Sequence, residues 1–319
     1  MPQHLHYVTL DVFAIEPFKG NPLAVVFLPQ DGASSISQEK KQLIAREFNF
    51  SETIFVHPHS SSAPSSRRID IFTTLHEIPF AGHPTIGASS WFQRHSQDPN
   101  DQGVTTIVTK SGDIPITKAA DGVSVAAQIA HNVRIHAARF PLSELLRLHS
   151  SLEPFLKQQT DGFPVVSIVN GMSQIHVELP NLEALAAVQP SAGGEMVHGD
   201  SSYLDDGWRA GLVVVYFFVR NVPDAATGKT VIRTRMFLGS LEDPATGSAA
   251  SGLAAYLSLI DPDIVRNGGA DFEVVQGVEM GRRSDIGVGV SLNEDRKTIK
   301  SVELKGAAVK VAEGDILVA

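Results

Sequence analysis

Two short segments of the chain could each hold an anion at the start of a helix. Gly82-His83-Pro84 and Thr246-Gly247-Ser248 each follow strand-like residues, and each opens a segment of small residues that we predict to be helical. The N–H groups of a first helical turn lack partners within the helix, and the helix dipole adds positive potential there. Two such ends facing each other could bind a carboxylate and stabilise an enolate-like intermediate. Alternatively, Thr246 and Ser248 only cap a helix, which is the commoner role of these residue types.

Glu47 is the candidate for moving a proton. It lies near the end of a helix predicted over residues 37–48, and apolar residues flank it. If this environment is dry, desolvation raises the pKa of the Glu47 carboxyl and lets it act as acid and base near neutral pH. The alternative is a surface carboxylate that pairs with Lys40, Lys41 or Arg46 on the face of the helix.

Two further side chains could assist in proton transfer. His83 could donate a hydrogen bond to a substrate oxygen, or it is a histidine at a helix end with no role. Asp243 could lie over the second helix start, or it is an acid that only interacts favourably with the helix dipole. In the interpretation with a functional site, Glu47, His83, Asp243 and Ser248 carry catalysis, and Gly82, Pro84, Thr246 and Gly247 bind the substrate; the alternatives stay open on these residues alone.

Metal and nucleotide sites are not expected. His57-Pro58-His59 has a proline between its histidines, a serine-rich stretch after them and no later His/Glu pair at helical spacing, so we predict an exposed loop there. The glycines at 20 and at 277–281 match no phosphate loop or dinucleotide pattern. We therefore predict that the protein uses neither a metal nor a cofactor.

The composition narrows the class of protein. A length of 319 residues suits one large domain or two ordinary ones, and a net charge of −9 without a Lys/Arg block argues against nucleic-acid or anionic-membrane partners. The longest apolar run, 210–219, is far shorter than the roughly 20 residues of a membrane span. The chain has no cysteine, which removes disulfides and thiolate chemistry. The first residues alternate like a strand and do not resemble a secretory leader, so we expect a cytoplasmic protein.

The second half of the chain repeats the order of elements in the first half. Each half contains strands, a short helix, further strands and then a helix rich in Gly, Ala and Ser, which begins near residue 83 or residue 246. Such small residues let surrounding strands approach closely, as expected of a helix enclosed by a curled sheet. We predict an internal duplication, with a boundary between residues 127 and 156.

Five ordered segments resemble the PhzF-like (phenazine biosynthesis-like) family over nearly the whole chain. They lie at residues 11–26, 45–53, 77–87, 242–249 and 276–282, and they include Gly20-Asn21-Pro22, Ser51-Glu52-Thr53, Gly82-His83-Pro84, Asp243-Pro244-Ala245-Thr246-Gly247-Ser248 and Gln276-Gly277. The resemblance implies the diaminopimelate epimerase-like fold: α/β (α+β), with two similar domains that each curl a mainly antiparallel sheet around a central helix. It implies an N-terminal domain of residues 1–128, completed by a strand at 309–319, a C-terminal domain of residues 129–308, and an active site in the cleft between them.

The resemblance also implies the reaction. In that family the residue matching Glu47 shuttles a proton between substrate carbons, and those matching His83, Asp243 and Ser248 line the site. Related racemases use a cysteine at each helix start, where this chain has Ala81 and Ala245, so two-thiol racemisation is excluded.

We therefore expect an isomerase that acts on a small anionic metabolite, cyclic or unsaturated, and that forms a homodimer. A non-catalytic member of the fold that binds a metabolite or a protein is the alternative, and a hydrolase or lyase with Ser248 as nucleophile lacks the expected elbow motif. Residues 60–67 and 191–206 are expected to be loop expansions.

Overall fold

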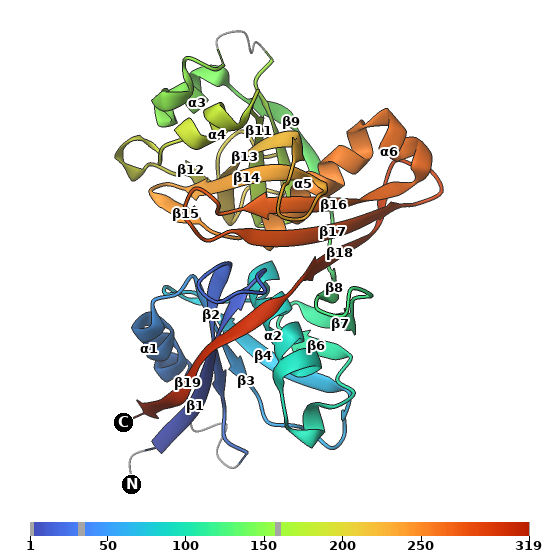
Figure 1. Ribbon diagram of the computed structural model, residues 1–319. Helices are drawn as coiled ribbons and strands as arrows, with labels where there is room; N and C mark the ends of the chain where they lie inside the picture. Colours follow the sequence, from blue (N-terminus) through green and yellow to red (C-terminus); the bar gives the residue numbers. More distant parts are fainter. Residues whose placement is uncertain (1–2, 31–35, 157–160, 319) are drawn as a thin grey trace. The chain divides into compact units, whose positions relative to one another are not determined.

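The computed structural model describes residues 3–30, 36–156 and 161–318, which form two compact units (Figure 1). The first unit comprises Met1–Ile129 and Leu304–Ala319, and the second comprises Ala130–Glu303. The predicted domain boundary, between residues 128 and 129, lies one residue before the observed one. The last strand, β19 (Ala308–Val318), pairs antiparallel with the first strand, β1 (Gln3–Val12), so both ends of the chain build the first unit.

The first unit is a curled sheet around one helix. Its helices are α1 (Gln38–Phe48) and α2 (Gly82–Ser90), with a π turn at Trp91–His95 and a 3-10 turn at Pro99–Asp101. After β1, its strands are β2 (Asn21–Phe27), β3 (Glu52–Val56), β4 (Ser66–Phe72), β5 (Glu77–Ile78), β6 (Thr106–Thr109), β7 (Gly112–Lys118) and β8 (Val125–Ile129). Strand β1 pairs antiparallel with β2, β2 parallel with β3, β3 antiparallel with β4, β4 parallel with β6, and β6 antiparallel with β7.

The second unit has the same organisation around another helix. Its helices are α3 (Leu142–Leu148), α4 (Leu182–Ala187), α5 (Gly247–Ile260) and α6 (Pro262–Asn267), with 3-10 turns at Ser150–Leu152 and Ala192–Gly194. Its strands are β9 (Arg134–Phe140), β10 (Phe163–Val169), β11 (Met172–Glu178), β12 (Val197–His198), β13 (Leu212–Pro223), β14 (Thr230–Leu238), β15 (Leu241–Asp243), β16 (Gly269–Gln276) and β17 (Ser284–Leu292), and β18 (Ile299–Gly306) continues into the first unit.

The strand pairings of the two units repeat one another. Strand β10 pairs antiparallel with β11, β11 parallel with β13, β13 antiparallel with β14, β14 parallel with β16, and β16 antiparallel with β17. This is the order seen from β1 to β7 in the first unit. A short helix separates the second and third strands of each repeat, and α2 or α5 follows a short strand that pairs with the fourth. The predicted internal duplication is confirmed at the level of topology.

The two central helices are buried because their residues are small. All nine residues of α2 are buried, as are ten of the fourteen residues of α5. A Cβ atom at Gly87 would lie 2.2 Å from Cδ2 of Leu23 on β2, so any larger residue there would force the Leu23 side chain or the helix to move. Figure 1 shows each helix among the strands of its own unit.

One local prediction needs correction. The segment 60–67 is not all loop: β4 begins at Ser66, and Arg67 is buried in an ion pair with Asp101. None of the helices in the described part of the chain is long and apolar enough to cross a membrane.

Candidate active site

The start of α2 supplies backbone donors and one histidine. Ala81 is the N-cap residue, and the first intrahelical bond runs from the N–H of Thr85 to the oxygen of Ala81 at 3.3 Å. The N–H groups of Gly82 and His83 therefore have no partner within the helix. Pro84, the third helical residue, has no N–H to offer. The site at this helix start thus has two backbone donors and the His83 side chain.

Glu52 fixes the His83 imidazole. Nδ1 of His83 lies 3.0 Å from Oε2 of Glu52, which stands at the first position of β3. The His83 side chain is 4% exposed, and its Nε2 atom is buried with no hydrogen-bond partner among the described residues. Burial acts to raise the pKa of Glu52, but the hydrogen bond from His83 and its positive charge outweigh it and lower that pKa below the usual value. The ionised Glu52 keeps the proton on Nδ1 and leaves Nε2 for another group.

The start of α5 offers three backbone donors and two polar side chains. Thr246 is the N-cap residue, and the first intrahelical bond joins the N–H of Ala250 to the oxygen of Thr246 at 3.0 Å. The N–H groups of Gly247, Ser248 and Ala249 are therefore free of intrahelical partners. The Thr246 hydroxyl does not cap the helix. It donates to Oδ2 of Asp243 at 2.5 Å.

Ser248 also differs from the capping interpretation. Its side chain is partly exposed, and no hydrogen bond joins its hydroxyl to any other residue that the structure describes. The interpretation of Thr246 and Ser248 as simple caps is therefore wrong. The Asp243 carboxylate lies at this helix start, where it accepts the hydrogen bond from Thr246. The predicted site residues of the second unit therefore lie close together in the chain.

Glu47 stands apart from these contacts. Its side chain is exposed near the end of α1, not enclosed by apolar residues as the sequence suggested. The predicted alternative, an ion pair on the helix face, is not seen either: Lys41 binds Asp70, and Arg46 donates to the oxygen of Thr74 at 3.1 Å. Within the described ranges, no side chain hydrogen-bonds or ion-pairs with Glu47. Its carboxylate is therefore available to a ligand, but its role stays a prediction.

Polar contacts hold α1, and with it Glu47, against β4. Lys41 on α1 is buried, and its Nζ lies 2.5 Å from Oδ2 of Asp70 on β4. Nε2 of His57 lies 2.8 Å from the same oxygen, so the segment at His57 is a loop as predicted but is half-buried and not exposed. Burial acts to raise the pKa of Asp70, but His57 and Lys41 hold it far below its usual range. Gln42 adds a hydrogen bond to the oxygen of Thr73 at 2.9 Å.

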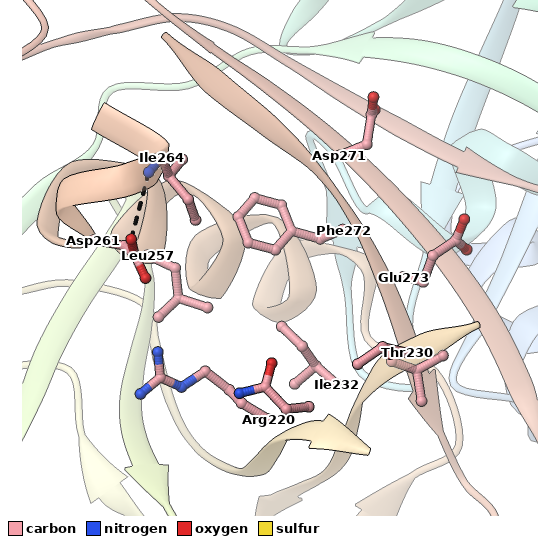
Figure 2. Close-up of a pocket in the computed structure, with 11 residues that line it drawn as sticks. Arg220, Thr230, Ile232, Leu257, Asp261, Ile264, Asp271, Phe272 and Glu273 are labelled. Carbon is pink, nitrogen blue, oxygen red and sulfur yellow. Dashed lines mark hydrogen bonds between the residues drawn. The ribbon is translucent and has the colours of Figure 1, made fainter. Parts of the chain in front are cut away.

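A surface cavity lies at the other end of α5, away from Asp243 and Ser248. It has a volume of about 190 Å³, and Figure 2 shows Ile232, Leu257, Ile264 and Phe272 lining it. The charged groups at its edge already have partners: Arg220 pairs with Glu178, Glu273 pairs with Lys229, and Asp261 accepts hydrogen bonds at the start of α6. The cavity is therefore not part of the candidate site.

Sequence reasoning missed two residues. Glu52 is 31 positions from His83, and Gln276, whose amide contacts the turn before α5, is 30 positions from Thr246. Both stood in segments that carried the family resemblance, and this was the only signal for them. No group of three or more His, Cys, Asp or Glu residues in the described chain could hold a metal ion.

The repeated units and their buried central helices define an epimerase-like α+β fold. A solved hydroxyproline epimerase from Agrobacterium vitis shares this fold with a TM-score of 0.59 at 13% identity, over 100% of this chain and 94% of that chain. A solved phenazine biosynthesis protein of the PhzF family from Bacillus anthracis reaches a TM-score of 0.74 at 23% identity, over 99% of this chain and 100% of that one. The predicted fold class is confirmed.

The family is shown by sequence. The family described as phenazine biosynthesis-like protein matches residues 10–314, so the chain belongs to this family. A trans-2,3-dihydro-3-hydroxyanthranilate isomerase from Pseudomonas chlororaphis is 32% identical over 98% of this chain and 99% of its own length. A human phenazine biosynthesis-like domain-containing protein is 26% identical over 96% of each chain.

Proposed function

We propose that the protein is an isomerase that moves a proton within a small carboxylate-bearing metabolite, cyclic or unsaturated, without a metal or cofactor. Its full-length similarity to a trans-2,3-dihydro-3-hydroxyanthranilate isomerase supports the reaction class. The observation that carries the proposal is the free Nε2 of His83, a buried polar atom aimed away from the carboxylate that fixes the ring. A buried polar group without a partner is costly unless a ligand or water completes it.

The proposed mechanism uses Glu47 as a single acid and base. Its carboxylate removes a proton from a substrate carbon next to a conjugated system, and the electron pair of the broken C–H bond moves into that system as an enolate-like anion. The same carboxyl group then returns the proton to another carbon, so no atom is lost or gained. His83, Asp243 and Ser248 hydrogen-bond to the substrate. Gly82, Pro84, Thr246 and Gly247 shape the helix starts that bind its carboxylate and stabilise the developing charge.

We further propose that the protein is a homodimer in the cytoplasm. Light scattering on the purified protein tests the oligomeric state directly: a mass of twice 34.3 kDa is expected, and the monomer mass would contradict the dimer.

Solvent-deuterium exchange tests the reaction. We expect wild-type protein in D₂O to place deuterium on a ring carbon of trans-2,3-dihydro-3-hydroxyanthranilate, followed by NMR, and we expect Glu47→Gln to lower the rate by about 10²–10⁴-fold. Glu39→Gln is the matched control, because Glu39 is another exposed glutamate on α1. Exchange that survives Glu47→Gln removes Glu47 from this role.

The exposure of Glu47 favours one second candidate, a non-catalytic metabolite-binding protein of the same fold. In that case the wild type binds cyclic carboxylates in a calorimeter, but it exchanges no deuterium into any of them. Binding that weakens on His83→Ala but not on Glu47→Gln would support this candidate over the isomerase.

A further inference from the structure

The side chain of Gln276 lies at the centre of a buried hydrogen-bond network in the second unit. Gln276 is the last residue of β16, and its side chain is fully buried. Its Nε2 donates to the backbone oxygen of Asp243 at 2.7 Å and to Oγ1 of Thr246 at 3.0 Å. Its Oε1 accepts from the backbone N–H of Thr246 at 3.3 Å. One amide thus binds the turn between β15 and α5 at both of its ends.

A second pair of residues orients this amide from behind. The hydroxyl of Tyr216 on β13 lies 3.1 Å from Oε1 of Gln276 and 3.1 Å from Oγ1 of Thr234 on β14. Both residues are fully buried. Burial raises the pKa of Tyr216 well above its usual value, so its hydroxyl stays protonated and can donate. Because the donor faces Oε1, the NH₂ group of Gln276 must point at Asp243 and Thr246.

The neighbouring glycine constrains the same turn by close contact. A Cβ atom at Gly277 would lie 2.7 Å from the oxygen of Pro244 and 2.5 Å from the oxygen of Arg282. Its φ of +74° is also a conformation that favours glycine. Pro244 belongs to the turn that Gln276 binds. The hydrogen bonds of Gln276 and the close packing of Gly277 are independent of each other, and both constrain residues 243–246.

We infer that Gln276 and Gly277 act as positioning residues that set the places of the Asp243 carboxylate and of the free N–H groups at the start of α5. The contact runs through Thr246, whose hydroxyl donates to Asp243 and whose oxygen accepts the first intrahelical bond of α5. The inference rests on the proposed function for its effect on rate. Such positions matter most where charge develops in the transition state, so loss of the amide lowers kcat more than it raises KM.

Gln276→Met tests the inference, because methionine has a similar size and shape but cannot make any of these hydrogen bonds. We expect kcat for deuterium exchange to fall by roughly 10- to 100-fold, with KM changed by less than about threefold. Gln174→Met is the matched control, because Gln174 is a buried glutamine of the same unit. Among the described residues its side chain hydrogen-bonds only to the oxygen of Met172, and its Oε1 has no partner. An unchanged kcat in Gln276→Met overturns the inference.

Hydrogen–deuterium exchange of the backbone separates positioning from general destabilisation. We expect faster exchange over residues 243–249 in Gln276→Met, with the last turns of α5 unchanged, and no such pattern in Gln174→Met. This measurement needs no turnover. It therefore tests whether Gln276 orders residues 243–249 even if the wild type proves inactive and the proposed function fails. Uniformly faster exchange across the unit, or no change at 243–249, contradicts the inference.

Tyr216→Phe covers the possibility that Gln276→Met does not fold. It removes only the hydroxyl that orients the amide and leaves both donors to the turn in place. We expect the same pattern of kcat loss and local exchange, smaller than in Gln276→Met. Wild-type values for both quantities would contradict the role given to the network.

Discussion

Replacing Glu52 by glutamine removes the charge of this side chain but keeps its shape, so the variant isolates the contribution of the charge. In the wild type, Nδ1 of His83 donates to an ionised carboxylate at 3.0 Å in a site where the Glu52 side chain is only 18% exposed. Glutamine keeps the length and one acceptor oxygen, but it removes the charge. A hydrogen bond to a charged group contributes about 1.5–3 kcal/mol, compared with about 0.5–1.5 kcal/mol for a neutral one. We therefore expect Glu52→Gln to lower the free energy of unfolding by about 1 kcal/mol at pH 7.

The pH dependence of this loss follows from the direction of the pKa shift. Burial acts to raise the pKa of Glu52, but the hydrogen bond and charge of His83 lower it overall, so the folded value lies below the unfolded value of about 4.3. The stabilisation by Glu52 is then fully present above about pH 4.3 and is lost as the pH falls through the lower, folded pKa. The difference between wild type and variant should be present at pH 7 and pH 5, and it should shrink below about pH 4.

Thermal unfolding measured between pH 7 and pH 3.5 checks both the size of this loss of stability and the direction in which it changes with pH. For a domain of 150–250 residues, 1 kcal/mol corresponds to a Tm difference of about 2–4 °C. Glu39→Gln, at an exposed glutamate in the first turn of α1, removes only a screened interaction with the helix dipole and should lower Tm by less than Glu52→Gln does. Equal Tm values for wild type and Glu52→Gln at pH 7 would refute a stabilising contact between Glu52 and His83. A Tm difference that grows below pH 4 would refute the expected direction of the pH dependence.

Glu52→Gln should also change catalysis. The glutamine side chain can accept from or donate to Nδ1, so the preference for a proton on Nδ1 is lost, and Nε2 no longer has one defined state. We expect kcat for deuterium exchange to fall, but by less than the loss of about 10²–10⁴-fold that removal of a proton-transfer group causes. A kcat equal to that of the wild type would show that His83 needs no orienting partner.

Two further changes test how the first unit is held together. Asp70→Asn leaves the buried Lys41 without a counter-charge and should lower the free energy of unfolding by about 3–5 kcal/mol, whereas Glu313→Gln, at an exposed ion pair, should change it by less than about 1 kcal/mol. Equal effects in chemical denaturation would contradict the buried pair. Gly87→Ala places a methyl group 2.2 Å from Cδ2 of Leu23 and should cost about 1–3 kcal/mol, so an unchanged denaturation midpoint would show that α2 can shift without cost.

The two helix starts are equivalent in topology but are fixed by different means. At α2 a side chain of the helix itself, His83, is held by Glu52 from the start of β3. At α5 the turn before the helix is held by Gln276 from the end of β16. The duplicated fold supplies two similar N-terminal sites, and side chains from different strands distinguish them. A pattern of strands and small-residue helices therefore predicts that two such sites exist, but not what holds each one.

The sequence by itself determined the features that depend on composition and on short spacing. The absence of cysteine excludes two-thiol racemisation, and the small residues after Gly82 and Gly247 predict two buried helices. Asp243 lies three residues before Thr246, so one turn of chain is enough to bring them together. Order and spacing of the motifs were likewise sufficient to indicate the family.

Only the tertiary structure decided the long-range contacts and the exposure of the candidate acid. The pairing of Glu52 with His83 depends on the place that β3 takes in the sheet, and the contact of Gln276 with the Asp243 turn depends on the parallel register of β14 and β16. Glu47 is exposed because α1 turns Lys41, Ile44 and Ala45 toward the sheet. Strand register and helix rotation are set by the packing of the whole unit, and no local stretch of sequence contains that information.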